Sequence, residues 1–203
     1  MDSGTSSTLV YLIAIPLFSS AFLLLGGRAL DRFGHLIGTA ASAASFVFAL
    51  IELNKMLGRE EESRGVTQRL FTWINVGSFQ VDATLLLDQL SICFVLLITG
   101  VGTLIHIYSI SYMSHDIDRR RFFAYLNLFI AAMLLLVLGN SYLNLYVGWE
   151  GVGVCSFMLI GFWYKEHANN EAAKKAFIMN RVGDLGLIVA MILIFSNTGT
   201  LNY

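Results

Sequence analysis

Proline occurs once and cysteine twice among the 203 residues, and charged residues make up only 13% of the chain. The single proline and the long apolar runs exclude a disordered, collagen-like or proline-rich chain. The net charge of −1 excludes a strongly basic nucleic-acid-binding domain, so no nucleic acid is expected as a partner. Cys93 and Cys155 both lie inside apolar runs, which predicts two buried thiols and neither a disulfide scaffold nor a zinc site.

Apolar residues are abundant instead: hydrophobic residues make up 56% of the chain, and the mean hydropathy is +0.68. This composition is typical of an integral membrane protein. Each of six apolar stretches is close to the roughly 20 residues that a helix needs to cross the hydrocarbon core. They are residues 9–26, 36–53, 85–112, 122–138, 143–163 and 172–195. Asp2 stands where a signal peptide would be basic, and no small-residue cleavage site follows, so the first stretch is predicted to be a retained helix.

The distribution of lysine and arginine predicts the orientation of the six spans. The loops after the first, third and fifth spans share one side and hold eight basic residues: Arg28, Arg32, Arg119, Arg120, Arg121, Lys165, Lys174 and Lys175. The opposite side holds four, namely Lys55, Arg59, Arg64 and Arg69. The excess places the odd-numbered loops in the cytoplasm and both ends of the chain outside. The three arginines at 119–121 are accordingly expected to form a solvated loop that faces lipid headgroups.

Residues 58–82 form the one long polar segment of the sequence. It begins with three glutamates, Glu60, Glu61 and Glu62, which are expected to form a solvated tip. Residues 70–81, LFTWINVGSFQV, indicate two short strands that turn around Val76, Gly77 and Ser78. An isolated hairpin is marginal in water, so this external hairpin is expected to pack on a neighbouring element.

Three ionisable residues lie inside apolar helices, where a charge costs roughly 2.5–3.5 kcal/mol. Glu150 is in the fifth span, and Arg181 and Asp184 are in the sixth. Glu150 precedes Lys165 by 15 residues, or about 22 Å of helix, and Asp184 follows Glu171 by 13 residues, or about 20 Å. The two carboxylates therefore lie at similar depth, and the three side chains are expected to meet near mid-membrane.

This group fits proton handling. Burial favours the neutral form of a carboxylate and a nearby cation favours its charged form, so a site whose cation moves can take up and release a proton. The alternative is a static Arg181–Asp184 pair that fixes helix packing beside an inert, protonated Glu150. Glu150 has no oppositely charged residue three or four positions away, and Gly148, Gly151 and Gly153 open the helix surface near it to water or to a neighbour.

Other ionisable residues have simpler interpretations. Asp88 is expected to cap the third span. His106 and His115 are expected to be interfacial rather than proton relays. Lys175 is expected to pair with Glu171 or reach the surface, with proton entry through this lysine as the alternative. The sequence has no cysteine cluster, no pair of histidines at haem spacing and no glycine-rich nucleotide loop, so no cofactor is expected on this chain.

Residues 143–164, LNLYVGWEGVGVCSFMLIGFWY, resemble the fifth helix of chain L of respiratory complex I, the distal antiporter-like subunit of proton-pumping NADH:quinone oxidoreductase. Three further stretches agree, namely LDQLS at 87–91, YSISYM at 108–113 and NRVGD at 180–184. The resemblance is clearest from about Ile74 to Tyr203.

The resemblance implies proton translocation coupled to quinone reduction in other subunits, which would hold the flavin and iron–sulfur clusters. Glu150 matches the family's helix-five glutamate, and Arg181 and Asp184 match its helix-six charged pair. The expected fold is an all-α integral membrane protein with six transmembrane helices and the external hairpin between helices two and three. Residues 1–83 would hold the first two helices and the hairpin, 84–121 the third helix and a cytoplasmic loop, and 122–203 the start of an inverted five-helix repeat. A broken helix with a partner lysine is expected after Tyr203.

Related families are the alternatives. The large subunit of multisubunit sodium/proton antiporters shares the Trp-Glu pair, and photosynthetic complex I-like proteins share the helix-six motif. The glycines after Glu150, together with NRVGD, favour respiratory complex I, and a non-transporting membrane scaffold is the remaining alternative. The expected partners are other membrane subunits of the complex, chiefly the neighbouring antiporter-like subunit, together with lipids and protons. The expected location is the inner membrane of a bacterium, with the mitochondrial inner membrane as the alternative.

Overall fold

The computed structural model of the chain describes residues 8–77 and 79–203, so Asp2 and Ser78 lie outside the described residues. Six α-helices and one hairpin account for most of it. The helices are α1 (Leu9–Leu25), α2 (Gly34–Leu57), α3 (Gln89–Tyr112), α4 (Arg119–Leu138), α5 (Tyr142–Ile160) and α6 (His167–Thr198). Short 3-10 turns, Gly27–Leu30 and Glu61–Ser63, follow α1 and α2, and strands β1 (Val66–Val76) and β2 (Phe79–Leu87) separate α2 from α3.

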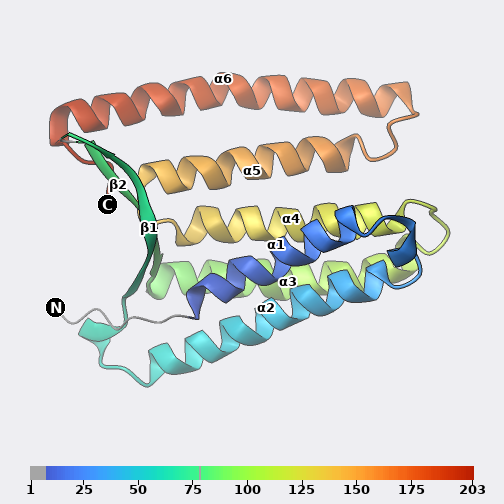
Figure 1. The fold of residues 1–203 in the computed structure, drawn as a ribbon, viewed down its shortest axis with the longest axis horizontal. Coiled ribbons are helices and arrows are strands. Elements are labelled where there is room, and N and C mark those ends of the chain that lie inside the picture. Colours follow the sequence, from blue (N-terminus) through green and yellow to red (C-terminus); the bar gives the residue numbers. More distant parts are fainter. Residues whose placement is uncertain (1–7, 78) are drawn as a thin grey trace.

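The six helices run side by side in alternating directions, and the hairpin crosses one end of the bundle (Figure 1). In the bundle α4 packs against α1 and α5, α2 packs against α1 and α3, and α6 packs on α5 at the outer edge. Because the number of helices is even, both described ends of the chain lie at the hairpin end (Figure 1). The predicted all-α bundle with a small antiparallel hairpin is confirmed.

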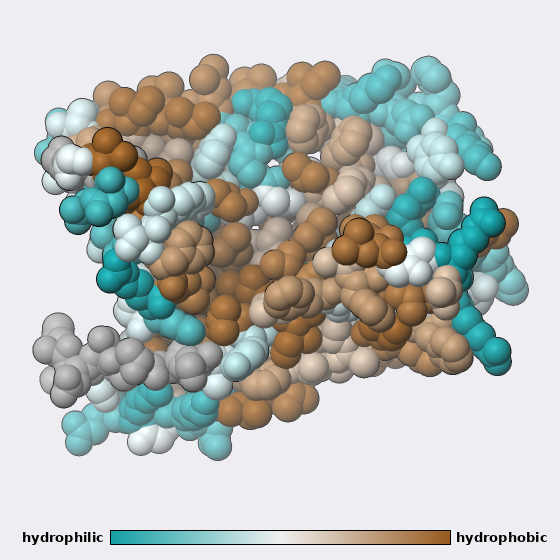
Figure 2. All heavy atoms as spheres, in the orientation of Figure 1, coloured by the Kyte–Doolittle hydropathy of each residue, from teal (hydrophilic) through white to brown (hydrophobic). Residues whose placement is uncertain are grey.

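Five helices, α2 to α6, are long and apolar enough to cross a membrane. The sixth, α1, is a 17-residue apolar helix that contains Pro16. Hydrophobic residues cover the middle of the visible face and hydrophilic ones gather toward both ends (Figure 2). One hydrophilic group interrupts this apolar band partway along α6, which carries Arg181 and Asp184 near its centre (Figures 1 and 2).

The hairpin is longer than the sequence analysis predicted. Residues 85–87 belong to β2, so the prediction that the third span begins at residue 85 was wrong. The reason is an alternation at period two: Val81, Ala83, Leu85 and Leu87 are buried along one face of β2. Helix α3 begins only at Gln89, where Asp88 accepts a hydrogen bond from Ser91 N at 2.7 Å and forms a capping box with Ser91. The predicted capping role of Asp88 is confirmed.

The hairpin packs against the turn between α4 and α5, as predicted for a strand pair that cannot stand alone. The carbonyl oxygen of Thr84 accepts hydrogen bonds from Asn140 N at 3.0 Å and from Asn144 Nδ2 at 2.8 Å. Leu201, after α6, accepts from Tyr142 N at 3.0 Å. Contacts from β2 and from the segment after α6 therefore converge on the start of α5.

Two of the three arginines at 119–121 do not form the solvated loop that was predicted. All three lie in the first turn of α4. Arg120 donates from Nε to Asp31 Oδ1 at 2.7 Å, and its Nη1 donates to the carbonyl of Leu23 in the last turn of α1. Arg121 lies over the Phe162 ring and donates to that residue's carbonyl at 3.1 Å. Carbonyls at helix ends lack partners within their own helix, and Arg120 supplies one for α1.

One cysteine prediction is confirmed and the other is wrong. Cys155 is buried in α5, whereas Cys93 is exposed on α3. The helices of this bundle are apolar on all sides, so an apolar run does not reveal which side chains face neighbouring helices and which face outward. The face of α2 that carries Gly38, Ser42 and Ser45 is buried, and small residues of this kind let neighbouring membrane helices approach closely.

Candidate functional site

Glu150 and Arg181 meet across the α5–α6 interface. Glu150 is the ninth residue of α5, and Arg181 is the fifteenth of the 32 residues of α6, so both are near the middle of their helices. Glu150 Oε2 and Arg181 Nη2 form an ion pair between side chains that are 20% and 37% exposed. The expectation that α5 and α6 face each other at this depth is confirmed by this contact.

Asp184 is the third member of the group and the most deeply buried, with its side chain 4% exposed. Its Oδ2 lies 3.1 Å from Arg181 Nε, one helical turn earlier on α6, but the two atoms are not aligned for a hydrogen bond. Its Oδ1 accepts a hydrogen bond from Trp149 Nε1 at 2.8 Å. The sequence analysis predicted the three charged side chains and missed the tryptophan.

The surroundings of the group are close-packed. The guanidinium of Arg181 lies 4.5 Å from the centre of the Phe177 ring, a cation–π contact. A Cβ built on Gly148 would lie 2.5 Å from backbone atoms of Leu136 in α4, and one on Gly151 would lie 3.0 Å from Ala132. A Cβ on Gly153 would lie 3.6 Å from Arg181 Nη2. Of the two possibilities that the sequence left open for these glycines, the structure shows contact with neighbouring helices.

The two carboxylate oxygens of Glu150 have different surroundings. Oε2 is paired with Arg181, whereas Oε1 is buried and has no well-aligned hydrogen bond within the described residues. The Tyr146 side chain, one turn earlier on α5, interacts with the same carboxylate. Buried carboxylate oxygens are normally hydrogen-bonded, to protein groups or to ordered water. Arg181 is the cation that pairs with the Glu150 carboxylate across the interface.

Lys175 lies outside this group. It is exposed on α6, six residues or about 9 Å of helix before Arg181. Glu171 pairs with Lys174, at 3.2 Å, so of the two expectations for Lys175 the structure shows exposure at the surface.

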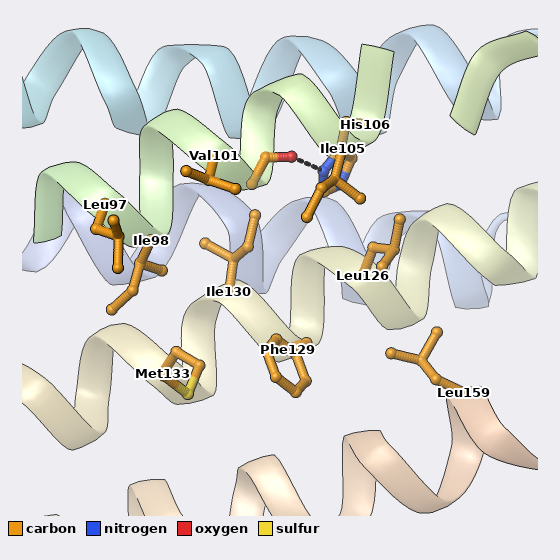
Figure 3. Close-up of a pocket in the computed structure, with 11 residues that line it drawn as sticks. Leu97, Ile98, Val101, Ile105, His106, Leu126, Phe129, Ile130, Met133 and Leu159 are labelled. Atoms are coloured by element: carbon orange, nitrogen blue, oxygen red, sulfur yellow. Dashed lines mark hydrogen bonds between the residues drawn. The ribbon is translucent and has the colours of Figure 1, made fainter. Parts of the chain in front are cut away.

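His106 is not interfacial, which corrects the prediction for that residue. It is 1% exposed in α3, and its Nδ1 lies 2.8 Å from the carbonyl of Gly102. Its Nε2 lies 3.2 Å from Asn127 Nδ2 of α4, which also donates to the carbonyl of Gly38 in α2. The ring borders a cavity of about 360 Å³, lined by apolar side chains of α3 and α4 together with Leu159 of α5 (Figure 3). His115 is exposed.

Glu52 is a buried carboxylate that the sequence analysis missed. Its side chain is 1% exposed in α2, and its Oε1 accepts hydrogen bonds from Lys55 Nζ at 2.8 Å and from Thr8 Oγ1 at 2.5 Å. The sequence feature that could have indicated this residue is a glutamate inside the apolar run ALIEL, residues 49–53. Glu52 lies toward the hairpin end of α2, and its hydrogen bond from Thr8, the residue before α1, joins α1 to α2.

Family matches place the chain among membrane domains of the antiporter-like class. Residues 139–203 match a family described as "NADH:quinone oxidoreductase/Mrp antiporter, TM". Residues 73–123 match a family described as "NADH-Ubiquinone oxidoreductase (complex I), chain 5 N-terminus".

Curated relatives identify the family within that class. NADH-quinone oxidoreductase subunit L of Mycobacterium tuberculosis (strain H37Rv) is 59% identical over 192 residues, which cover 95% of this chain and 30% of the relative. Subunit L of Escherichia coli (strain K12) is 41% identical over 193 residues, which cover 94% and 31%. The chain belongs to the family of complex I subunit L homologues. It spans about 30% of the length of these relatives, and its five long apolar helices indicate a multi-pass membrane protein.

Two solved structures share the fold. The Mrp complex from Dietzia sp. DQ12-45-1b matches with a TM-score of 0.77 and 25% identity, over 96% of this chain and 20% of that one. The membrane-bound sulfane sulfur reductase, an archaeal respiratory membrane complex, matches with a TM-score of 0.80 and 18% identity, over 97% of this chain and 39% of that one. The second likeness concerns the fold alone.

Proposed function

We propose that this chain is part of a proton-translocating membrane subunit of NADH-quinone oxidoreductase. The observation that carries the proposal is the buried group of Glu150, Arg181 and Asp184 midway along two facing helices. The Glu150 carboxylate is paired with Arg181 across the interface, and it is suited to take up a proton when Arg181 withdraws.

Each residue has a separate role in this proposal. Glu150 carries the proton. Arg181, which stays charged at any physiological pH, neutralises Glu150 when that carboxylate is ionised. Asp184 keeps the guanidinium close to the site through its contact with Arg181 Nε at 3.1 Å. Lys175, exposed near the loop end of α6, is a candidate for proton entry.

The wider assignment rests on the relatives named above. The redox chemistry, with flavin and iron–sulfur clusters, belongs to partner subunits, and the chief partner of this chain is a neighbouring antiporter-like subunit. The charge distribution places the hairpin and both ends of the chain outside and the loops that carry Arg119 and Lys165 in the cytoplasm. Helices α4 to α6 form the start of the first inverted repeat.

Two other functions each have a specific observation in their favour. A sodium/proton antiporter subunit is favoured by the likeness to the Mrp complex, although the identity of 25% is far below the 59% to subunit L. A static scaffold is favoured by the fact that every member of the group has a partner in the described structure.

The test is Glu150→Gln in the full-length subunit, assembled in its membrane complex and studied in inverted membrane vesicles. We expect normal recovery of the complex and strongly reduced acidification driven by NADH oxidation, because the amide cannot carry a proton. Glu171→Gln is the matched control, since Glu171 is exposed on α6 and is paired only with residues of its own helix. Acidification at the wild-type rate in Glu150→Gln would favour the scaffold, and dependence on sodium would favour the antiporter.

A further inference from the structure

Trp149 and Glu150 are consecutive residues of α5 that contact two different residues of α6. Adjacent helix positions point about 100° apart, so both can face one neighbouring helix only near its two edges. Trp149 Nε1 donates to Asp184 Oδ1 at 2.8 Å, and Glu150 Oε2 pairs with Arg181 Nη2. The α5–α6 interface thus has two polar contacts across it, and the Arg181–Asp184 contact joins them along α6.

The tryptophan determines how Asp184 faces the guanidinium. An arginine and a carboxylate that are free to arrange themselves favour two parallel N–H···O bonds. Asp184 does not form this arrangement, because Oδ1 is held by the indole and Oδ2 lies 3.1 Å from Arg181 Nε without alignment. The Nη2 group of Arg181 is therefore directed toward Glu150 instead of toward Asp184.

We infer that Trp149 is a positioning residue for proton translocation: its indole N–H holds Asp184 in an orientation that leaves Arg181 available to Glu150. This inference rests on the proposed function of the Glu150 group. The indole ring is half-exposed, at 48% for the whole residue, and its N–H edge reaches the carboxylate. Removal of the N–H group alone therefore changes the orientation of Asp184 more than it changes the packing of the helices.

The chain offers a matched control for this contact. Trp163 Nε1 donates to Asp116 Oδ2 at 2.8 Å, the same pair of groups at the same distance. That contact lies among exposed residues beyond the end of α5, away from Glu150 and Arg181. If the loss of any indole–carboxylate hydrogen bond reduced activity, replacing either tryptophan would slow acidification. If Trp149 positions Asp184, only the replacement of Trp149 slows it.

The experiment replaces Trp149 in the full-length subunit within the intact complex by two analogues of nearly equal shape. Benzothienylalanine has sulfur in place of the N–H group, and 5-fluorotryptophan retains the N–H group. We expect roughly tenfold slower acidification with benzothienylalanine, the factor that corresponds to one lost hydrogen bond to a charged group, and near-normal acidification with 5-fluorotryptophan. The same two analogues at Trp163 should both leave acidification unchanged.

A double-mutant cycle shows whether the effect passes through Asp184. Trp149→Phe should slow acidification in the wild-type background and cause no further loss in an Asp184→Ala background, because no side-chain oxygen remains there to accept the indole N–H group. Glu150→Gln, measured in the same vesicles, tests the proposed function separately: its failure to reduce acidification would remove that function. If Glu150→Gln slows acidification but benzothienylalanine at position 149 leaves it at the wild-type rate, only the role of Trp149 is overturned. Failure of the complex to assemble with benzothienylalanine would also overturn that role, in favour of a structural one.

Discussion

The guanidinium of Arg181 contacts Glu150 on the neighbouring helix and Asp184 on its own helix at the same time. One cation thus serves two carboxylates in an apolar bundle. Removal of the cation leaves two carboxylates without a paired cation, whereas removal of one carboxylate leaves a simple ion pair.

Arg181→Gln is therefore expected to be the most damaging single change in the group. Loss of one partner of a buried ion pair typically costs about 3–5 kcal/mol, and here two carboxylates are left behind. The double change Arg181→Gln with Asp184→Asn should recover more intact complex than Arg181→Gln alone. Recovery can be followed by native gel electrophoresis of detergent-solubilised membranes. Equal recovery of the two variants would show that water or another subunit already compensates the carboxylates.

Gly148→Ala is expected to separate α4 from α5. The added methyl group would lie 2.5 Å from the Cα and N atoms of Leu136, and backbone atoms cannot move aside as a flexible side chain can. Overpacking of this kind typically costs about 1–3 kcal/mol, which should lower the thermal unfolding temperature of the purified subunit. Gly65→Ala is the control, because nothing lies within 4 Å of the new methyl group there. An unchanged unfolding temperature in Gly148→Ala would contradict the close approach of the two helices.

Asp88→Ala is expected to destabilise the start of α3 by about 1 kcal/mol, through loss of the hydrogen bond from Ser91 N. Asp88→Asn should retain most of the stability, because an asparagine side-chain oxygen accepts the same bond. Thermal unfolding of the two variants provides the comparison. A similar loss in both would assign the effect to the negative charge rather than to the cap.

Single cysteines at Ser63 and Ser114 should react with an impermeant thiol reagent from opposite sides of the membrane. Both positions are exposed, and they lie in the segments at opposite ends of the bundle (Figure 1). Cys93 must be replaced in the background because it is exposed on α3, and Cys155 is replaced with it. Labelling in intact cells and in inverted vesicles distinguishes the sides. Reaction of both cysteines from one side would exclude the arrangement of the spans described here.

Much of the bundle could be predicted from the sequence, because the number and length of the apolar runs determine the number of helices and their alternation. The rise per residue was enough to place Glu150 and Asp184 at one depth. The contact of Trp149 with Asp184 was missed because it depends on rotation about the helix axis, which depth does not reveal. The burial of His106 and the exposure of Cys93 were mispredicted for the same reason, since helices that are apolar on all sides give no period to read.

The arginines at the start of α4 show a second limit. Arg120 is close to Asp31, 89 residues earlier, and to the end of α1. A count of basic residues per loop treats such a side chain as a free charge at the membrane surface. Contacts between distant parts of the chain turn it into a structural residue, and only the folded bundle shows this.

The hydrogen bonds at the two ends of α5 have a mechanical consequence. At one end Thr84 binds Asn140 and Asn144, and at the other Arg121 binds the carbonyl of Phe162. A displacement of α5 along its axis by one turn, about 5.4 Å, would break all three bonds and drive Gly148 past the backbone of Leu136. The helix is thus held in place along its axis, and the proposed movement of charge at Glu150 would have to come from rotation of side chains.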